Sequence, residues 1–237
     1  VNSAKDDAAG LAIAERMNAQ VRGMNVAIRN ANDAISLSQT AEGALGKVGD
    51  MLQRMRELAV QAANATNGAG DLANLDAEYQ ALGEEIGRAL GNTKFNGLAI
   101  LGADAGAQEF QVGANSGETI TVTTTDMSSD ADIAAVTGGD LTSAANASTA
   151  LTNIDTALDT LNGERAMYGA TQNRFEAVIG ALQVAAENQA AARSRIMDAD
   201  FAAETAALTR AQVLQQAGTA MLSQANSLPN NVLALLR

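Results

Sequence analysis

The side chains that most often carry catalysis or bind metals are missing or scattered in this sequence. It contains no His and no Cys, which excludes imidazole-dependent triads, thiolate nucleophiles and zinc–thiolate sites. Neighbouring carboxylates occur at Asp6-Asp7, Glu84-Glu85 and Asp198/Asp200, where they could act as acid/base pairs or calcium ligands. They lack EF-hand spacing, and acidic residues favour helix starts, so we interpret them as helix caps or solvated faces. The sequence predicts neither an enzyme nor a cofactor.

Two further groups could in principle bind anions. Residues 102–106 form a glycine-containing loop without the Lys-Ser/Thr ending that grips phosphate, so we expect a turn. Arg54, Arg56 and Arg88 are few beside 27 acidic residues and a net charge of −12. That charge repels phosphate backbones and anionic lipids, which argues against nucleic-acid partners. The arginines could form ion pairs, for example with Glu57, or an exposed recognition patch.

Composition favours long helices over one bulky core. Hydrophobic residues make up 47% of the chain, many of them alanine, and aromatic residues only 3%. Small side chains bury little area each, so stability must come from repeated contacts along extended elements. The single proline, Pro229, lies near the end and leaves long helices possible. No stretch approaches the ~20 apolar residues of a membrane span, so we expect no membrane insertion.

Heptad spacing predicts the N-terminal helices. Apolar residues over 17–35 recur in alternating steps of four and three, as on a packed helix. Gly43, Gly46 and Gly49 then interrupt the pattern, which resumes over residues 45–62 in a shifted phase. Each glycine costs roughly 1 kcal/mol relative to alanine, so the three could permit a close helix crossing or mark a connection. We expect two helices or one irregular helix.

The following region alternates helix, turn and strand signals. Asn and Gly enrichment over residues 64–70 predicts a loop, and the periodic residues 72–90 predict an amphipathic helix that returns antiparallel to the first. Phe95-Asn96-Gly97 predicts a turn. Strand-like runs at 110–112 and 119–122 predict a β-hairpin.

Residues 123–147 have no strong periodicity and are rich in Thr, Ser, Asp, Ala and Gly, so we expect a small exposed loop or insertion. The strongest heptad pattern follows over residues 151–196 and predicts a long coiled-coil-like helix packed on the N-terminal ones. Its polar seam residues Arg165, Gln172 and Gln189 could hold the helix register.

The C-terminal stretch is apolar enough to need a partner. A helical pattern beyond residue 200 ends in the apolar segment 232–236. Exposed apolar patches usually mark interaction surfaces. The candidate anchors are Leu208, Leu214, Met221, Leu228, Leu233 and Leu236. Together the patterns predict a mainly α fold, an elongated antiparallel helical bundle or coiled coil with a small β-hairpin region.

Several motifs resemble those of bacterial flagellins, in the same order along the chain. They include NSAKDDAAGLAIA at residues 2–14, LQRMRELAVQA at 52–62, SRIMDADF at 194–201 and PNNVLALLR at 229–237. The resemblance implies a D1-like core rod over residues 1–200, with the short variable insertion at about 123–147. It also implies a D0-like C-terminal helix and tail over residues 201–237. Because the chain lacks an initial Met, we expect the family's N-terminal segment to be missing.

The resemblance implies a structural subunit of the bacterial flagellar filament that self-assembles for motility. Its partners would be other flagellin subunits, the flagellar export apparatus and its chaperone, and its location would be outside the cell. The alternative is a flagellin-like surface adhesin or polysaccharide-binding protein. In that case the hydroxyl-rich residues 123–147 would face sugars, although they offer no aromatic platform.

The resemblance also implies a host partner, the Toll-like receptor that senses flagellin. Its contacts in the family are matched here by Arg54, Leu58 and Glu78. The seam 52, 55, 59 and 62 points inward, which leaves Leu58 as an expected exposed anchor. We expect Arg54→Ala or Leu58→Ala to weaken binding by about 1 kcal/mol or more. The candidate receptor or subunit-contact surface comprises Gln53, Arg54, Arg56, Glu57, Leu58, Gln61 and Glu78.

Overall fold

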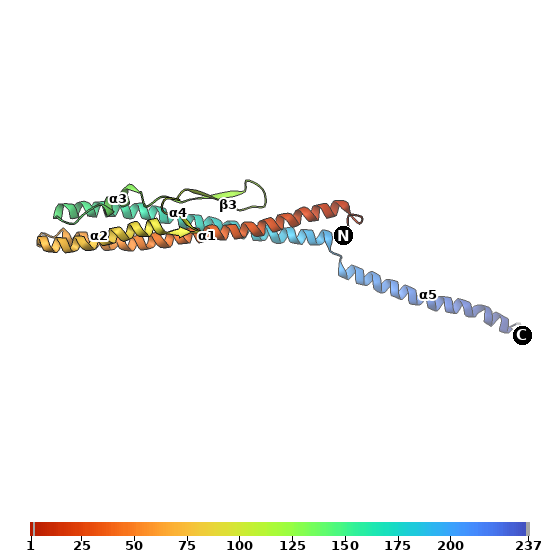
Figure 1. The fold of residues 1–237 in the computed structure, drawn as a ribbon. Helices are drawn as coiled ribbons and strands as arrows, with labels where there is room; N and C mark the ends of the chain where they lie inside the picture. The colour runs from red at the N-terminus through yellow and green to blue at the C-terminus, as the bar shows by residue number, and fades with distance from the viewer. Residues whose placement is uncertain (2, 236–237) are drawn as a thin grey trace. The chain divides into compact units, whose positions relative to one another are not determined.

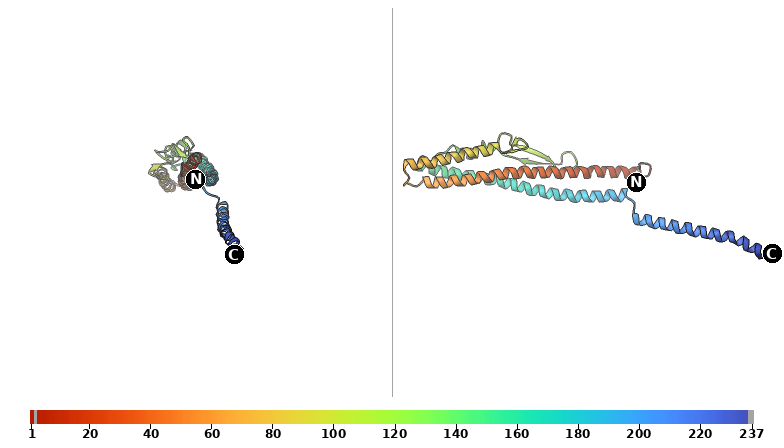
Figure 2. Two further views of the ribbon diagram at one scale, coloured as in Figure 1. Left: turned by 90° about the vertical axis from the view of Figure 1, so that its right-hand side faces the viewer. Right: turned by 60° about the horizontal axis from the view of Figure 1, so that its bottom comes forward.

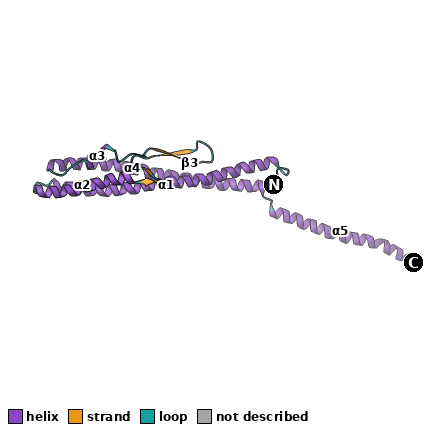
Figure 3. Cartoon of the chain, in the orientation of Figure 1, coloured by secondary structure: helices purple, strands orange, loops and turns teal. Residues whose placement is uncertain are grey.

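The computed structural model describes residues 1 and 3–235, with the side chains of residues 226–235 left undescribed. The chain is mainly helical, and two short antiparallel strand pairs follow the second helix (Figures 1 and 3), which confirms the predicted fold class. The helices are α1 (Ala8–Ala62), α2 (Ala69–Asn92), α3 (Ala131–Thr137), α4 (Ala144–Met197) and α5 (Phe201–Leu235).

The chain divides into two compact units. One, which we call the bundle unit, comprises Ala19–Gln189. The other, the terminal unit, comprises Val1–Asn18 together with Ala190–Arg237. In the bundle unit α1 lies beside α4, and α2 returns antiparallel along α1 as predicted (Figure 2).

The core of the bundle unit follows the predicted heptad seams. Leu45, Leu52 and Met55 of α1 are fully buried, as are Tyr168 and Phe175 of α4. These residues belong to one continuous apolar cluster. The seams meet because helical residues three and four apart lie on one face, so a repeat of this spacing gives each helix a continuous apolar stripe.

α1 runs unbroken through its three glycines, so the alternative of two helices is wrong. A Cβ added at Gly43 or Gly46 would meet nothing within 4 Å, and at Gly49 only Leu161 Cδ2 at 3.5 Å. The first two glycines therefore do not serve a close helix crossing. Buried heptads on both sides hold the helix together, because tertiary packing contributes more to a helix than local propensity does.

Two strand pairs follow α2. β1 (Lys94–Phe95) and β2 (Leu98–Ala99) pair antiparallel around Asn96-Gly97, whose φ angles of 49° and 86° confirm the predicted turn. Positive φ at both central residues is the mark of a tight hairpin turn. β3 (Ala107–Gln111) and β4 (Thr119–Thr123) form the predicted hairpin.

Residues 123–147 are not an exposed loop, so that expectation is wrong. The segment contains α3 and buries Met127, Ile133, Val136 and Leu141. Its few apolar residues are irregularly spaced because they pack from turns and one short helix. No single period could reveal them in the sequence.

α2 holds this segment through three side chains. Tyr79 Oη donates to the Val136 carbonyl at 3.0 Å, and Gln80 Nε2 donates to the Gly139 carbonyl at 2.8 Å. Asp76 Oδ1 accepts the Leu141 N–H at 2.8 Å. Burial raises the pKa of Tyr79 to about 12, so its hydroxyl stays protonated as a donor.

In the terminal unit, carboxylates set where helices begin. Asp7 Oδ1 accepts the N–H groups of Ala9 and Gly10 at 3.0 and 2.9 Å, and Asp200 Oδ1 accepts that of Ala202 at 3.0 Å. The predicted capping roles of Asp7 and Asp200 are therefore confirmed. Across the described part of the chain, no helix has the length and hydropathy to cross a bilayer.

Candidate assembly and contact surfaces

An ion-pair network links α1 to α2 on the surface of the bundle unit. Arg54 Nε lies 2.8 Å from Glu78 Oε1, and its Nη1 lies 2.7 Å from Glu57 Oε2. The hydrogen bond to Glu78, followed by that to Glu57, raises the pKa of Arg54. The side chains of Arg54 and Glu78 are about half exposed, and that of Glu57 is 67% exposed, so the network faces solvent.

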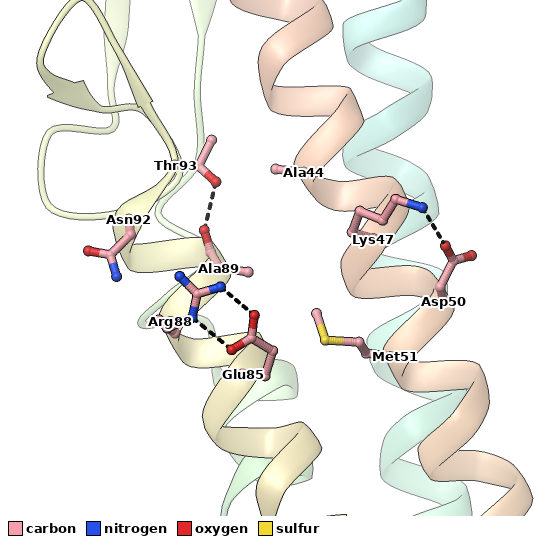
Figure 4. Close-up of a pocket in the computed structure, with 9 residues that line it drawn as sticks. All are labelled: Ala44, Lys47, Asp50, Met51, Glu85, Arg88, Ala89, Asn92 and Thr93. Carbon is pink, nitrogen blue, oxygen red and sulfur yellow. Dashed lines mark hydrogen bonds and ion pairs between the residues drawn. The ribbon is translucent and has the colours of Figure 1, made fainter.

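Leu58 does not belong to this surface, so the expectation of an exposed apolar anchor is wrong. Its side chain is 1% exposed and lies in the core cluster. Buried residues of α1, α2 and α4 form one apolar cluster, and Figure 4 shows ribbons of all three helices near one another, so α1 buries a broader face than one heptad seam. A residue beside the seam is then covered as well.

The other residues of the candidate surface are exposed or half-buried, but they face different neighbours. Arg56 Nε pairs with Asp155 Oδ1 of α4 at 2.7 Å, which lowers the pKa of that carboxyl. Gln53, Arg56 and Glu57 line a shallow depression of about 280 Å³ with Val60. Gln61 is exposed near the end of α1. The heptad pattern identified α1 but gave no signal for Asp155 or for the exposed Val60.

A larger groove of about 500 Å³ lies between α1 and α2 (Figure 4). Its charged residues pair along their own helices. Lys47 Nζ lies 3.3 Å from Asp50 Oδ2, and Arg88 Nε donates to Glu85 Oε2 at 2.7 Å. The ion-pair interpretation of the three arginines is therefore confirmed. The groove is lined by Ala44, Lys47, Asp50, Met51, Glu85, Arg88, Ala89, Asn92 and Thr93.

Both surfaces consist of ion pairs and apolar contacts. The charges described above pair with one another, and these ion pairs account for the shifted pKa values of Arg54, Glu85, Arg88 and Asp155. The described residues contain no group of three or more carboxylates that could hold a metal ion. What these surfaces offer is shape, charge pairs and apolar contact, the features of a protein interface.

Polar residues on the α4 seam meet a single carboxylate of α1. Gln172 Nε2 donates to Glu42 Oε2 at 3.1 Å, and Arg165 Nη2 lies 3.9 Å from Glu42 Oε1. The third polar seam residue, Gln189, has a buried Oε1 without a hydrogen-bond partner among the described residues. A polar contact at one level of an apolar seam favours one register, because sliding the helices would separate its partners.

α5 presents the most exposed apolar residues of the terminal unit. Leu208, Leu214 and Met221 are 56%, 65% and 70% exposed. Leu214 and Val213 also line a shallow depression on the helix surface. The remaining candidate anchors lie outside the described residues, Leu228 and Leu233 by their side chains and Leu236 entirely.

The bundle unit buries long heptad seams, and α5 exposes large apolar side chains, an arrangement that suits a structural protein that works by association. Residues 1–105 match the bacterial flagellin N-terminal helical region, and residues 151–236 match the bacterial flagellin C-terminal helical region. The chain belongs to the bacterial flagellin family. It is a structural subunit of the flagellar filament, as the sequence motifs predict.

Known flagellins are similar in sequence to this protein over its whole length. It is 49% identical to a flagellin of Halalkalibacterium halodurans, over 100% of this chain and 87% of the relative. It is 42% identical to a flagellin of Bacillus subtilis, over 100% and 88% of the two chains. Among solved structures, Bacillus cereus flagellin superposes with a TM-score of 0.58 at 39% identity, over 65% of this chain and 88% of that one.

Proposed function

We propose that this flagellin polymerises through α5, which acts as a D0-like inner helix, while residues 1–200 act as the D1-like rod. The observation that carries this proposal is the apolar stripe of α5. Its side chains Leu208, Leu214 and Met221 are each more than half exposed. Each Å² of such surface removed from water contributes about 25 cal/mol, so contacts repeated between subunits stabilise a polymer. A contact whose rotation does not close produces an open helical array.

Two variants of α5 test this role. Leu214→Glu places a charge on the apolar stripe, and Gln216→Glu places the same charge two residues away on another face. We expect Leu214→Glu to abolish salt-induced filament growth, measured by light scattering and electron microscopy, with the helix content of the monomer unchanged. Gln216→Glu should polymerise normally. Normal filaments from Leu214→Glu, or equal loss in both variants, would contradict the proposal.

Export and chaperone binding are consistent with an exposed apolar stripe on α5. We propose that the chain leaves the cell unfolded through the flagellar export apparatus and takes its place outside. A chaperone would cover the α5 stripe until assembly, since an exposed apolar helix invites aggregation. The sequence has no Cys, so no disulfide can form before or during passage. Capture of the chaperone by unmodified chain but not by Leu214→Glu would support this order of events.

The host Toll-like receptor is the second partner we propose, with the Arg54–Glu78 pair as the centre of its contact. These side chains are half exposed and bridge α1 and α2 at 2.8 Å. A fixed pair presents a defined charge pattern, which contributes to specificity in an interface. Leu58 is buried in the core beneath this surface and would not contact the receptor. The adhesin alternative would use the hydroxyl-rich residues 123–147, among which Ser128, Ser129 and Thr142 are exposed.

A further inference from the structure

One methionine differs from the rest in its exposure to solvent. The sequence has eight methionines, all within the described residues. Met221 on α5 is 70% exposed and Met167 on α4 is 36% exposed, whereas Met55 and Met127 are fully buried. Oxidation of a thioether requires the oxidant to reach the sulfur, so exposure determines which methionine reacts first.

Met221 lies on the apolar stripe of α5, so its oxidation would change the polarity of that stripe. It lies seven residues after Leu214, on the same face of α5. The seam positions beside these two are Ala211, Ala217 and Ala225, whose methyl groups bury little area. Leu214 and Met221 are therefore the large apolar side chains at the seam positions of this stretch, and Val213 and Leu222 widen the apolar face beside them.

We propose that Met221 is a peroxide-sensitive modification site that controls assembly, an inference that rests on the proposed role of α5. A sulfur lone pair attacks one oxygen of hydrogen peroxide and the O–O bond breaks. That oxygen remains on sulfur as the sulfoxide, and the other leaves as water after proton transfer. Sulfur loses two electrons and the peroxide gains them.

The product is polar where the stripe is apolar. A sulfoxide oxygen buried against Leu and Ala side chains finds no hydrogen-bond donor, which penalises the assembled state and not the solvated monomer. Oxidation of the monomer therefore raises the critical concentration for polymerisation, by about tenfold for one unpaired polar group. In a filament that covers α5, the same sulfur reacts more slowly.

The site is tested on the monomer by graded treatment with hydrogen peroxide and peptide mass spectrometry. We expect the sulfoxide to form first at Met221, next at Met167, and last at Met55 and Met127. Equal oxidation rates at Met221 and Met55 would overturn the assignment. This measurement does not depend on polymerisation, so it decides the site even if the filament role of α5 fails.

The control of assembly is tested with Met221→Leu and the matched variant Met167→Leu, each compared with its own untreated sample. Peroxide should raise the critical concentration of the unmodified chain and of Met167→Leu, but not that of Met221→Leu. Methionine sulfoxide reductases should restore the unmodified chain. An unchanged critical concentration after full oxidation of Met221 would refute the control, as would an equal rise in both variants. Failure of untreated chain to polymerise would instead contradict the proposed role of α5.

Discussion

Leu58 and Arg54 lie four residues apart on α1 and have opposite environments. Leu58 is 1% exposed, whereas the Arg54 side chain is 50% exposed and holds two carboxylates. Truncating Leu58 leaves a cavity among close-packed side chains, and truncating Arg54 leaves solvated carboxylates. One substitution therefore tests folding and the other tests recognition.

Leu58→Ala should lower the free energy of unfolding by about 2–5 kcal/mol, the usual cost of emptying a buried leucine site. The matched control is Val60→Ala, because Val60 is 53% exposed on the same helix. We expect the control to change stability by less than about 0.5 kcal/mol. Urea unfolding followed by circular dichroism gives both values. Equal stability of the two variants would show that Leu58 is not a core residue.

Arg54→Ala should weaken binding to the Toll-like receptor by about fivefold or more while leaving the unfolding midpoint nearly unchanged. The loss follows from removal of the cation that pairs with Glu78 and Glu57. Arg88→Ala is the control, since Arg88 is also exposed and pairs with Glu85 in its own helix. Binding can be measured by titration of the monomer into the receptor ectodomain. An unmodified monomer that does not bind, or equal weakening by both variants, rules out this contact.

At the scale of elements, α1 stays continuous against its local propensity. Gly43→Ala and Gly46→Ala should each stabilise the chain by about 0.5–1 kcal/mol, because the added methyl groups meet nothing within 4 Å. Gly23→Ala should destabilise it, since a Cβ there would lie 2.8 Å from Ala114 Cβ in the loop after β3. Thermal and urea unfolding measure the gain in stability of the first two variants and the loss in the third. A loss of stability in either of the first two variants would mean that α1 needs its glycines.

At the scale of the whole molecule, α4 and α5 should differ in amide exchange. α4 buries a seam in the bundle unit, whereas the described side chains of α5 are all exposed. An isolated helix gains little from propensity alone, so it opens often. We expect early exchange from Thr205 onward and slow exchange over residues 151–189 in the monomer, measured by mass spectrometry. Polymerisation should slow exchange in α5, and equal protection of both helices in the monomer would disprove the assignment.

The sequence alone predicted the helices α2, α4 and α5, the heptad seams, the β3–β4 hairpin, the turn at Asn96-Gly97 and the class of protein. Heptad spacing, turn residues such as Asn96-Gly97 and flagellin-like motifs are all local, so they can be recognised without knowing which elements meet. The same locality explains why the sequence predicts the C-terminal stripe as a candidate interaction surface.

Only the tertiary structure decided the continuity of α1, the burial of Leu58, the Arg56–Asp155 pair and the packing of residues 123–147. Each depends on contacts between residues far apart in the chain. Leu58 is buried because α1 has two neighbouring helices, and a heptad seam specifies only one. The segment around α3 is ordered by bonds from Tyr79 and Gln80, which no period within that segment could indicate. Local spacing sets which face of an element is apolar, and the arrangement of neighbours sets how much of the rest is covered.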